Sequence, residues 1–306
     1  MDFKKQLAEL TEYAEGVVVS YLPKEGGFQD TIIKASNYSV INGGKRLRPL
    51  MMMLSYELIR NQKSGAYPAA GRLSAEDEAV VGPFMAAIEM IHCSSLVHDD
   101  LPCMDNDTLR RGKPSTWAAY GEDMGTLAGD ALMLYAFETA VKSSGNPKQV
   151  TEAIRVLANK SGIFGMVGGQ TVDVELTGKR PDRKQLEYIY RNKTGALIEL
   201  SFMAGAILAG AGKRQVEALR KAALDTGMAF QIRDDILDVV STPEELGKPI
   251  GSDRENRKIT WLDYFGREAS ERMVSEFTAE AVSILKQNGN DPFFEQLLLS
   301  LINRRS

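Results

Sequence analysis

The sequence predicts an all-α fold built as a single domain over residues 1–306. Apolar side chains recur at steps of three and four residues along almost the whole chain, as one face of a helix requires, and no comparable stretch alternates apolar and polar residues as a strand would. The segment boundaries carry helix caps or short turns rich in Gly, Pro or Ser, and no repeat or low-complexity linker divides the chain. A bundle of roughly ten or more helices is therefore expected.

Local signals place the first helices. The opening segment has apolar residues at helical steps, namely Phe3, Leu7, Leu10, Ala14 and Val17. Pro49 suits the first turn of a helix that continues through Leu58, because its missing N–H is not needed there. Ser74, with Asp77 three residues later, is typical of a helix start. We expect short connections at 61–73, 101–114, 143–148 and 177–181.

Two later signals bound further helices, and one segment raises the question of a membrane. The helix after Ser74 should end at Pro102, just after Asp100, and Asp182 should begin another after the turn-like GKRP. The segment 195–212, GALIELSFMAGAILAGAG, approaches the length of a membrane span. Glu199 and the many small residues within it favour a helix buried among protein neighbours, so no membrane anchor is predicted.

Composition narrows the classes of function. The formal net charge of −4 offers no bulk positive charge to a nucleic acid, so no such partner is predicted. Cys93 and Cys103 are too few for a disulfide framework, and the start MDFKKQLAEL is too charged for a signal peptide, so a cytoplasmic location is expected. Only His92 and His98 are present, which excludes a histidine-rich zinc site. Any metal must therefore bind through carboxylates, which favours hard cations such as magnesium.

One aspartate cluster is DDILD, at residues 234–238. In a helix from Phe230 to Val240, Asp234 and Asp238 share a face and Asp235 is turned about 100° away. Two unpaired carboxylates raise each other's pKa, a cost that a divalent cation reverses. This cluster alone leaves two interpretations open, a solvated acidic face and a metal site.

The other aspartate cluster is DDLPCMD, at residues 99–105. Asp99 and Asp100 lie at the expected end of an apolar helix, and Asp105 returns from the following loop, so the three could chelate a cation. Arg110 and Arg111 follow within a dozen residues. A charged surface loop is the simpler interpretation, but it does not explain why so many aspartates follow an apolar helix.

A basic element, GGKRLRP, occupies residues 43–49. Lys45, Arg46 and Arg48 surround an expected helix start, where charge, guanidinium groups and free backbone amides suit a phosphate. Further single cations are Lys193, Lys248 and Lys258. Two acidic clusters combined with several basic elements suit one phosphorylated substrate held through metals and a second held directly by Lys and Arg.

Ordered motifs from about Gly43 to the C-terminus resemble those of the trans-isoprenyl diphosphate synthase family, which includes farnesyl and geranylgeranyl diphosphate synthases. The matching segments are GGKRLRP, DDLPCMDNDTLRRGKPS, LAGDALM, GGQTVDVE, NKTGALI, FQIRDDILD and ELGKPIGSD. The resemblance implies an isoprenoid synthase-type helical bundle around a deep central cavity, and a homodimer. It also implies a magnesium-dependent head-to-tail condensation of isopentenyl diphosphate with an allylic diphosphate, which is dimethylallyl, geranyl or farnesyl diphosphate.

The resemblance assigns roles to matching positions. Implied magnesium ligands are Asp99, Asp105 and Asp234, with Asp100, Asp235 and Asp238 as ligands or supporting groups, for three ions with bound diphosphate. Contacts to the allylic substrate fall on Arg110, Lys193, Thr194, Gln231 and Lys248. Contacts to isopentenyl diphosphate fall on Lys45, Arg48, His92 and Arg111, although the residues alone favour a core histidine at position 92. Gln170 and Asp173 match a pair near the metal site, and Lys258 and Arg304 are expected to close the site.

Product length is expected to depend on the helix that precedes Asp99. Ser95 and Ser94 lie four and five residues back, ~6–7.5 Å along the helix axis, where a growing tail would reach. Both are small, whereas many farnesyl synthases of this family have an aromatic residue at one of these positions. The cavity floor is therefore expected at Ile91, Ile88 or Ala87. A twenty-carbon product is favoured, with farnesyl diphosphate as the alternative.

Two other classes of protein compete with this prediction. A terpene cyclase also combines an aspartate-rich motif, magnesium and a helical cavity, but DDILD and GGKRLRP argue against it. A non-catalytic subunit of a prenyltransferase would tolerate the loss of metal ligands, yet both clusters are complete here.

Overall fold

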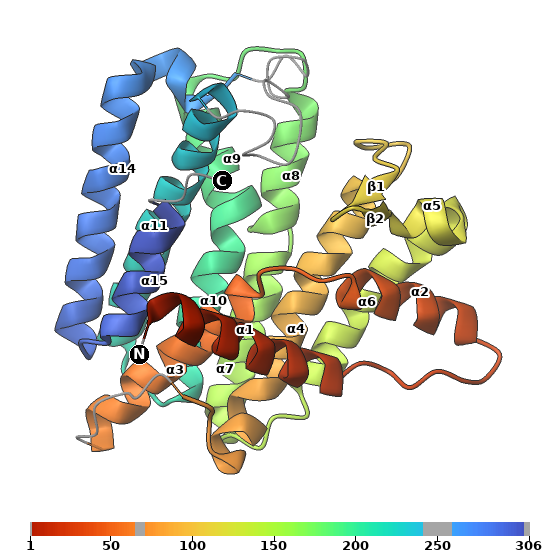
Figure 1. The fold of residues 1–306 in the computed structure, drawn as a ribbon, viewed down its shortest axis with the longest axis horizontal. Coiled ribbons are helices and arrows are strands. Elements are labelled where there is room, and N and C mark those ends of the chain that lie inside the picture. Colours follow the sequence, from red (N-terminus) through yellow and green to blue (C-terminus); the bar gives the residue numbers. More distant parts are fainter. Residues whose placement is uncertain (1, 65–70, 241–258, 303–306) are drawn as a thin grey trace. The chain divides into compact units, whose positions relative to one another are not determined.

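The computed structural model describes residues 2–64, 71–240 and 259–302. Within these ranges the chain is almost entirely helical, and its only strands are the two-residue β1 (Leu109–Arg110) and β2 (Lys113–Pro114) (Figure 1). The chain divides into two compact units, Met1–Leu54 with Ala69–Ile154, and Ser55–Pro68 with Arg155–Ser306. The all-α prediction is confirmed, while the single domain stays a prediction.

The first unit is built around α4 (Ala75–Asp99), which α6 (Glu122–Ala140) accompanies side by side (Figure 1). From Val81 to Ile91 every side chain of α4 is buried, as expected for the central helix of a core. Among the described helices α4 alone is long and apolar enough to cross a membrane, and 78% of the apolar window is buried inside the protein. The remaining helices are α1 (Phe3–Ser20), α2 (Asp30–Ile41) and α5 (Thr116–Tyr120), with parts of α3 (Leu47–Ser64) and α7 (Pro147–Ser161).

Small residues let α4 and α6 approach closely. The Ser94 hydroxyl donates to the backbone carbonyl of Gly129 at 2.8 Å. A Cβ atom at Gly129 would lie only 2.1 Å from Nε2 of His98, so the space beside this glycine is already filled. The contact fixes the end of α4, which immediately precedes the aspartate cluster at 99–105.

The second unit places α11 (Lys213–Val240) against both α10 (Gly195–Leu208) and α14 (Trp261–Asn288). Ile232 and Ile236 of α11 share a core with Trp261 and Val274 of α14. The other elements are α8 (Met166–Glu175), α9 (Arg183–Ile189), the π-helix η1 (Tyr190–Thr194) and α15 (Pro292–Ile302). This arrangement keeps the DDILD cluster, at the C-terminal end of α11, beside a core rather than on a loop.

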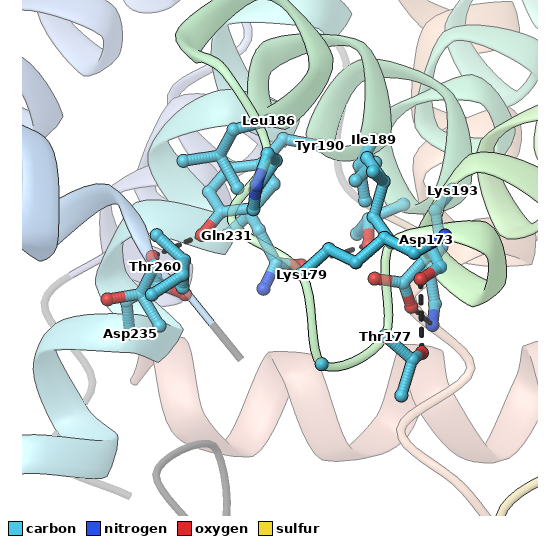
Figure 2. A pocket seen from close by; sticks show the side chains of 15 residues that line it. Asp173, Thr177, Lys179, Leu186, Ile189, Tyr190, Lys193, Gln231, Asp235 and Thr260 are labelled. Atoms are coloured by element: carbon cyan, nitrogen blue, oxygen red, sulfur yellow. Dashed lines mark hydrogen bonds and ion pairs between the residues drawn. The ribbon is translucent and has the colours of Figure 1, made fainter. Parts of the chain in front are cut away.

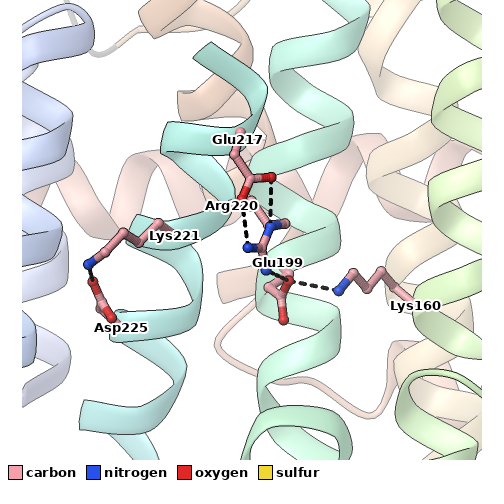
Figure 3. A network of polar contacts seen from close by, with 6 residues as sticks. All are labelled: Lys160, Glu199, Glu217, Arg220, Lys221 and Asp225. Carbon is pink, nitrogen blue, oxygen red and sulfur yellow. Dashed lines mark hydrogen bonds and ion pairs between the residues drawn. The ribbon is translucent and has the colours of Figure 1, made fainter. Parts of the chain in front are cut away.

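The charge of Glu199 is paired inside the second unit (Figure 3). Glu199 lies on α10, where nearly every side chain is buried, and its Oε2 is 2.7 Å from the Lys160 ammonium and 3.3 Å from Arg220 Nη1. Arg220 is also paired with Glu217 at 2.7 Å. The helix predicted to be buried among protein neighbours is therefore a core helix, because basic groups on α7 and α11 compensate its single charge.

The predicted helix boundaries are largely confirmed. Ser74 caps α4 by accepting the N–H of Asp77 at 3.1 Å, and Asp182 opens α9 with a reciprocal capping box. The connection expected at 61–73 was placed too early, because α3 continues to Ser64. The expected loop at 101–114 contains a hairpin that the sequence did not predict, with Arg111 (φ 54°) and Gly112 (φ 75°) as its turn.

Candidate functional site

The aspartate cluster at 99–105 folds back on the end of α4. Asp99 is the last residue of the helix, Pro102 follows in the turn, and the N–H of Asp105 donates to the Asp99 carbonyl at 2.8 Å. The N–H of Asp107 donates to the Asp100 carbonyl at 3.1 Å. The predicted return of Asp105 to the helix end is confirmed.

Asp100 is buried and paired with Arg110. Arg110 Nε donates to Asp100 Oδ1 at 2.9 Å, and Arg110 Nη2 also contacts both Asp100 and Asp107. Burial raises the pKa of Asp100, and the bound Arg110 opposes part of that rise. Asp100 thus holds Arg110 in place at the base of the hairpin, which accords with a supporting role. Its role as a metal ligand stays a prediction.

A basic pocket in the first unit unites the residues predicted to bind isopentenyl diphosphate. Its lining includes Lys45, Arg48, His92 and Arg111, together with Asn42, Gly44, Arg46, Leu47 and Glu89. These residues come from the 43–49 turn, the start of α3, the middle of α4 and the hairpin turn. The Arg111 guanidinium packs on the backbone at Gly44, where a Cβ atom would lie 2.9 Å from its Cζ. The absence of a side chain at Gly44 allows this close approach.

The charges in the basic pocket are only partly balanced. Nε of Arg48 is buried and has no hydrogen-bond partner among the described residues. Burial lowers the pKa of Arg48, and the charge of Glu89 opposes this. Burial, then the charges of Arg48 and Arg111, hold the pKa of His92 well below its usual value. His92 is therefore neutral at pH 7, and the pocket suits an anion met by guanidinium groups and a neutral imidazole.

Arg46 is the exception in this motif. Its side chain is fully buried, with Nη1 donating to Glu89 at 2.6 Å and Nη2 donating to Glu15 at 3.0 Å and to the Val40 carbonyl. Arg46 also lines the basic pocket, but Glu15 and Glu89 already pair its charge, so its predicted contact with a phosphate stays a prediction. Its backbone has a positive φ of 46°.

A second pocket, in the second unit, contains the residues predicted to contact the allylic substrate (Figure 2). Lys193 and Thr194 enter it from the π-helix η1, and Gln231 enters from α11. The Lys193 ammonium lies 2.6 Å from Asp173 Oδ2, and the Thr194 hydroxyl donates to Gln231 Oε1 at 2.9 Å. Gln170, half-buried one turn before Asp173 on α8, completes the predicted pair. Such π-helical turns are rare, and those that do occur are frequently found at functional sites.

The DDILD cluster borders this second pocket. Asp235 lines it and is buried, Asp238 is also buried, and Asp234 is half-buried. Asp235 accepts the hydroxyl of Tyr190 and the backbone N–H of Trp261. No sequence signal identified Tyr190 or Trp261, because these contacts join segments that lie 45 and 26 residues from Asp235.

The residues expected to limit product length lie on two sides of α4. Ser94 and Ile91 are fully buried, and Ser94 faces Gly129 of α6. Ser95 is half-buried and donates to the His92 carbonyl at 2.8 Å. Ile88 and Ala87 are fully buried further back along α4. The predicted cavity floor stays a prediction, as do the roles of Lys248, Lys258 and Arg304, which lie outside the described residues.

The carboxylates fit magnesium by their donor chemistry, since this hard cation prefers oxygen ligands. A backbone hydrogen bond joins Asp105 to Asp99, and Asp234 and Asp238 are one helical turn apart on α11. Within the described residues, no three or more His, Cys, Asp or Glu side chains form a group that could hold a metal by themselves. Metal binding by either cluster stays a prediction.

Comparisons with known proteins agree with the motifs. The polyprenyl synthetase family model matches residues 29–290. The chain is 42% identical to the chloroplastic geranylgeranyl pyrophosphate synthase of Capsicum annuum over 253 residues, which are 82% of this chain and 64% of that protein. It is 46% identical to farnesyl diphosphate synthase of Geobacillus stearothermophilus over 231 residues, which are 74% of this chain and 73% of that protein.

The fold also matches a solved structure along almost its whole length. The geranyltransferase from Helicobacter pylori, complexed with magnesium and isoprenyl diphosphate, covers 99% of this chain and 97% of its own. The TM-score is 0.79 at 28% sequence identity. The predicted all-α isoprenoid synthase fold is thereby confirmed.

Proposed function

Because the chain belongs to the polyprenyl synthetase family, we propose that it condenses isopentenyl diphosphate head to tail with an allylic diphosphate and releases a short-chain trans-prenyl diphosphate. The observation that carries the proposal is the basic pocket, where Lys45, Arg48, His92 and Arg111 meet from separate segments. Three cations and a neutral imidazole suit a diphosphate. The pocket around Lys193 suits a second one.

Different residues bind the two substrates. Lys45, Arg48 and Arg111 hold the diphosphate of isopentenyl diphosphate, and neutral His92 donates a hydrogen bond. Lys193, Thr194 and Gln231 orient the allylic diphosphate, and Arg110 adds positive charge near the first aspartate cluster.

The reaction proceeds without a side-chain nucleophile. The allylic carbon–oxygen bond breaks and its electron pair leaves with the diphosphate. The double bond of isopentenyl diphosphate then attacks the allylic carbon, and the proton lost afterwards goes to the departing diphosphate. Cations fixed in place before reaction stabilise the charge that develops on that leaving group.

Magnesium is the cofactor of this proposal, with three ions when diphosphate is bound. Asp99, Asp105 and Asp234 would hold it, and Asp238 lies one turn from Asp234 on the same face of α11. When bound, it supplies positive charge that neutralises the leaving diphosphate. The family and the magnesium in the Helicobacter pylori geranyltransferase structure support this assignment.

We propose geranylgeranyl diphosphate as the main product. The small side chains of Ser94 and Ser95 support it, since neither shortens the space beside α4. The relatives include both geranylgeranyl and farnesyl diphosphate synthases, so a fifteen-carbon product is the competing outcome.

A homodimer in the cytoplasm completes the proposal. Leu127, Leu134 and Val141 are spaced seven residues apart along α6 and its C-cap, and are 49%, 73% and 59% exposed. An apolar stripe of this kind is typical of a helix covered by another subunit. Leu134→Glu should convert a dimer to a monomer in light scattering; if the parent chain is already a monomer, this part of the proposal is wrong.

One assay tests the proposed activity. Purified protein, magnesium and isopentenyl diphosphate are incubated with dimethylallyl, geranyl or farnesyl diphosphate, and product lengths are measured by mass spectrometry. We expect a twenty-carbon diphosphate, and a predominantly fifteen-carbon product would overturn the chain-length assignment. Hydrocarbon formed from the allylic diphosphate alone would indicate a cyclase, and inactivity of the purified chain would indicate a subunit that needs a partner.

A further inference from the structure

One oxygen atom of Asp235 joins three segments of the second unit. The Tyr190 hydroxyl donates to Asp235 Oδ2, and the backbone N–H of Trp261 donates to the same oxygen at 3.0 Å. The Trp261 N–H also lies 3.2 Å from the Tyr190 hydroxyl oxygen. We call this triangle the Asp235 junction; it connects α11, η1 and the first residue of α14.

The Asp235 junction is enclosed by aromatic rings. Asp235 and Trp261 are each 3% exposed and Tyr190 is 6% exposed. The Trp261 ring stacks on Phe265 at 4.9 Å between centroids and lies 5.7 Å from the Tyr190 ring. Because these side chains are almost fully buried, hydrogen bonds to this carboxylate are strong, and leaving one unmade is costly.

All three segments that meet at the junction also form walls of the second pocket (Figure 2). Thr260, which immediately precedes Trp261, lines that pocket. Tyr190 begins the π-helical turn from which Lys193 and Thr194 enter it. One carboxylate oxygen therefore links these walls, in addition to the core that Tyr190 and Trp261 share with α11.

The π-helical turn is held at both ends. At its start, Tyr190 is bound to Asp235. At its end, Gly195 packs so closely on α11 that a Cβ atom at Gly227 would lie 3.0 Å from the Gly195 Cα. Lys193 and Thr194 lie between these two attachments, so removing one attachment loosens one end of the turn, while Lys193 still contacts Asp173 and Thr194 still contacts Gln231.

We propose that Asp235 is a positioning residue which, through Tyr190 and the Trp261 N–H, sets where Lys193 and Thr194 stand beside the DDILD cluster. The inference rests on the proposed function, because it concerns the subsite for the allylic diphosphate. It assigns Asp235 a task different from that of Asp234 and Asp238, which share another face of α11.

Tyr190→Phe removes one donor of the junction and keeps the ring. The matched control is Tyr188→Phe, which removes a hydroxyl from a 39% exposed side chain two residues away. In steady-state kinetics we expect Tyr190→Phe to raise KM for geranyl diphosphate roughly five- to tenfold, with KM for isopentenyl diphosphate unchanged. Equal changes in both KM values, or none beyond the control, would overturn the proposal.

Asp235→Asn and Asp234→Asn separate positioning from metal binding. Asparagine at 235 keeps a side-chain oxygen that can accept the Trp261 N–H and the Tyr190 hydroxyl. We expect Asp235→Asn to leave the half-saturating magnesium concentration within about twofold of the parent, whereas Asp234→Asn raises it roughly tenfold or more. If both variants raise it equally, Asp235 is a metal ligand and the positioning role is wrong.

A fluorescence measurement tests the junction without any catalysis. Trp117 and Trp261 are the two tryptophans of the chain, so Trp117→Phe leaves Trp261 as the reporter. In that background, Tyr190→Phe should shift the emission to the red and increase quenching by acrylamide, whereas Tyr188→Phe should not. An unchanged Trp261 signal refutes the junction even in an active enzyme. An inactive parent chain that shows the expected shift refutes the proposed function alone.

Discussion

Replacing Arg46 and Arg48 one at a time by glutamine should separate folding from substrate binding within one seven-residue motif. Arg46 is fully buried between Glu89, whose side chain is 3% exposed, and Glu15 at 33%. Arg46→Gln leaves the buried Glu89 carboxylate without its cation. Removing one partner of a buried ion pair costs about 3–5 kcal/mol, and this loss should appear in the free energy of unfolding.

Arg48→Gln should act on binding instead. Arg48 lines the basic pocket, and its buried Nε has no hydrogen-bond partner among the described residues. Replacing Arg48 therefore removes no hydrogen bond that Nε makes to those residues. Loss of a charge-assisted contact to a diphosphate costs about 1.5–3 kcal/mol, which corresponds to a roughly 10- to 150-fold increase in KM for isopentenyl diphosphate. The free energy of unfolding should change by less than about 1 kcal/mol.

Urea unfolding followed by circular dichroism, together with steady-state kinetics at fixed allylic diphosphate, measures both effects. We expect the two variants to have different effects: Arg46→Gln lowers the urea midpoint and Arg48→Gln raises KM for isopentenyl diphosphate. If Arg46→Gln raises KM without loss of stability, Arg46 acts in substrate binding and its ion pairs do not stabilise the fold. If Arg48→Gln leaves KM unchanged, the basic pocket does not bind isopentenyl diphosphate.

Three further variants test other parts of the structure. Ser94→Tyr should shorten the main product in mass spectrometry, with a melting curve as control because Ser94 packs on Gly129; an unchanged product would refute the placement of the cavity floor. Burial lowers the pKa of His92 in the folded state, so below about pH 6.5 the unfolded chain takes up a proton that the folded chain does not. The free energy of unfolding therefore decreases as the pH is lowered. His92→Gln should therefore lose less urea stability than the parent between about pH 7.5 and about pH 5.5, and an equal loss would contradict this. Glu199→Gln should lower the free energy of unfolding by about 2–3 kcal/mol, and adding Lys160→Met should recover part of it; additive losses would show that the pair is not coupled.

Much of the fold was predictable from local chemistry. The caps at Ser74 and Asp182, and the helix end before Pro102, depend on residues three or fewer apart in sequence, so the sequence displays both partners together. The hairpin at 109–114 was not predicted, because its strands have only two residues each and leave no alternating pattern. Its turn at Arg111 and Gly112 depends on backbone angles that composition alone does not reveal.

The site divides in the same way. Ordered motifs identified the aspartate clusters and the charged residues predicted to bind substrate in both pockets, because the proposed chemistry of two diphosphates needs carboxylates and cations of recognisable types at set spacings. What those groups contact was decided by tertiary structure. Arg46 and Arg48 both border the basic pocket, yet Arg46 is paired with Glu15 and Glu89, whereas the Nε of Arg48 has no hydrogen-bond partner among the described residues.

By itself the sequence determined the helical class, the position of each acidic and basic motif, and the family to which they belong, because these depend on periodicity and on residue types close together in the chain. Only the tertiary structure decided that Asp100 holds Arg110 and that Asp235 joins Tyr190 to the start of α14. The physical reason is that a buried carboxylate takes its hydrogen-bond donors from whichever segments pack around it. Here the side chains that donate to Asp100 and Asp235 are 10 and 45 residues away in sequence.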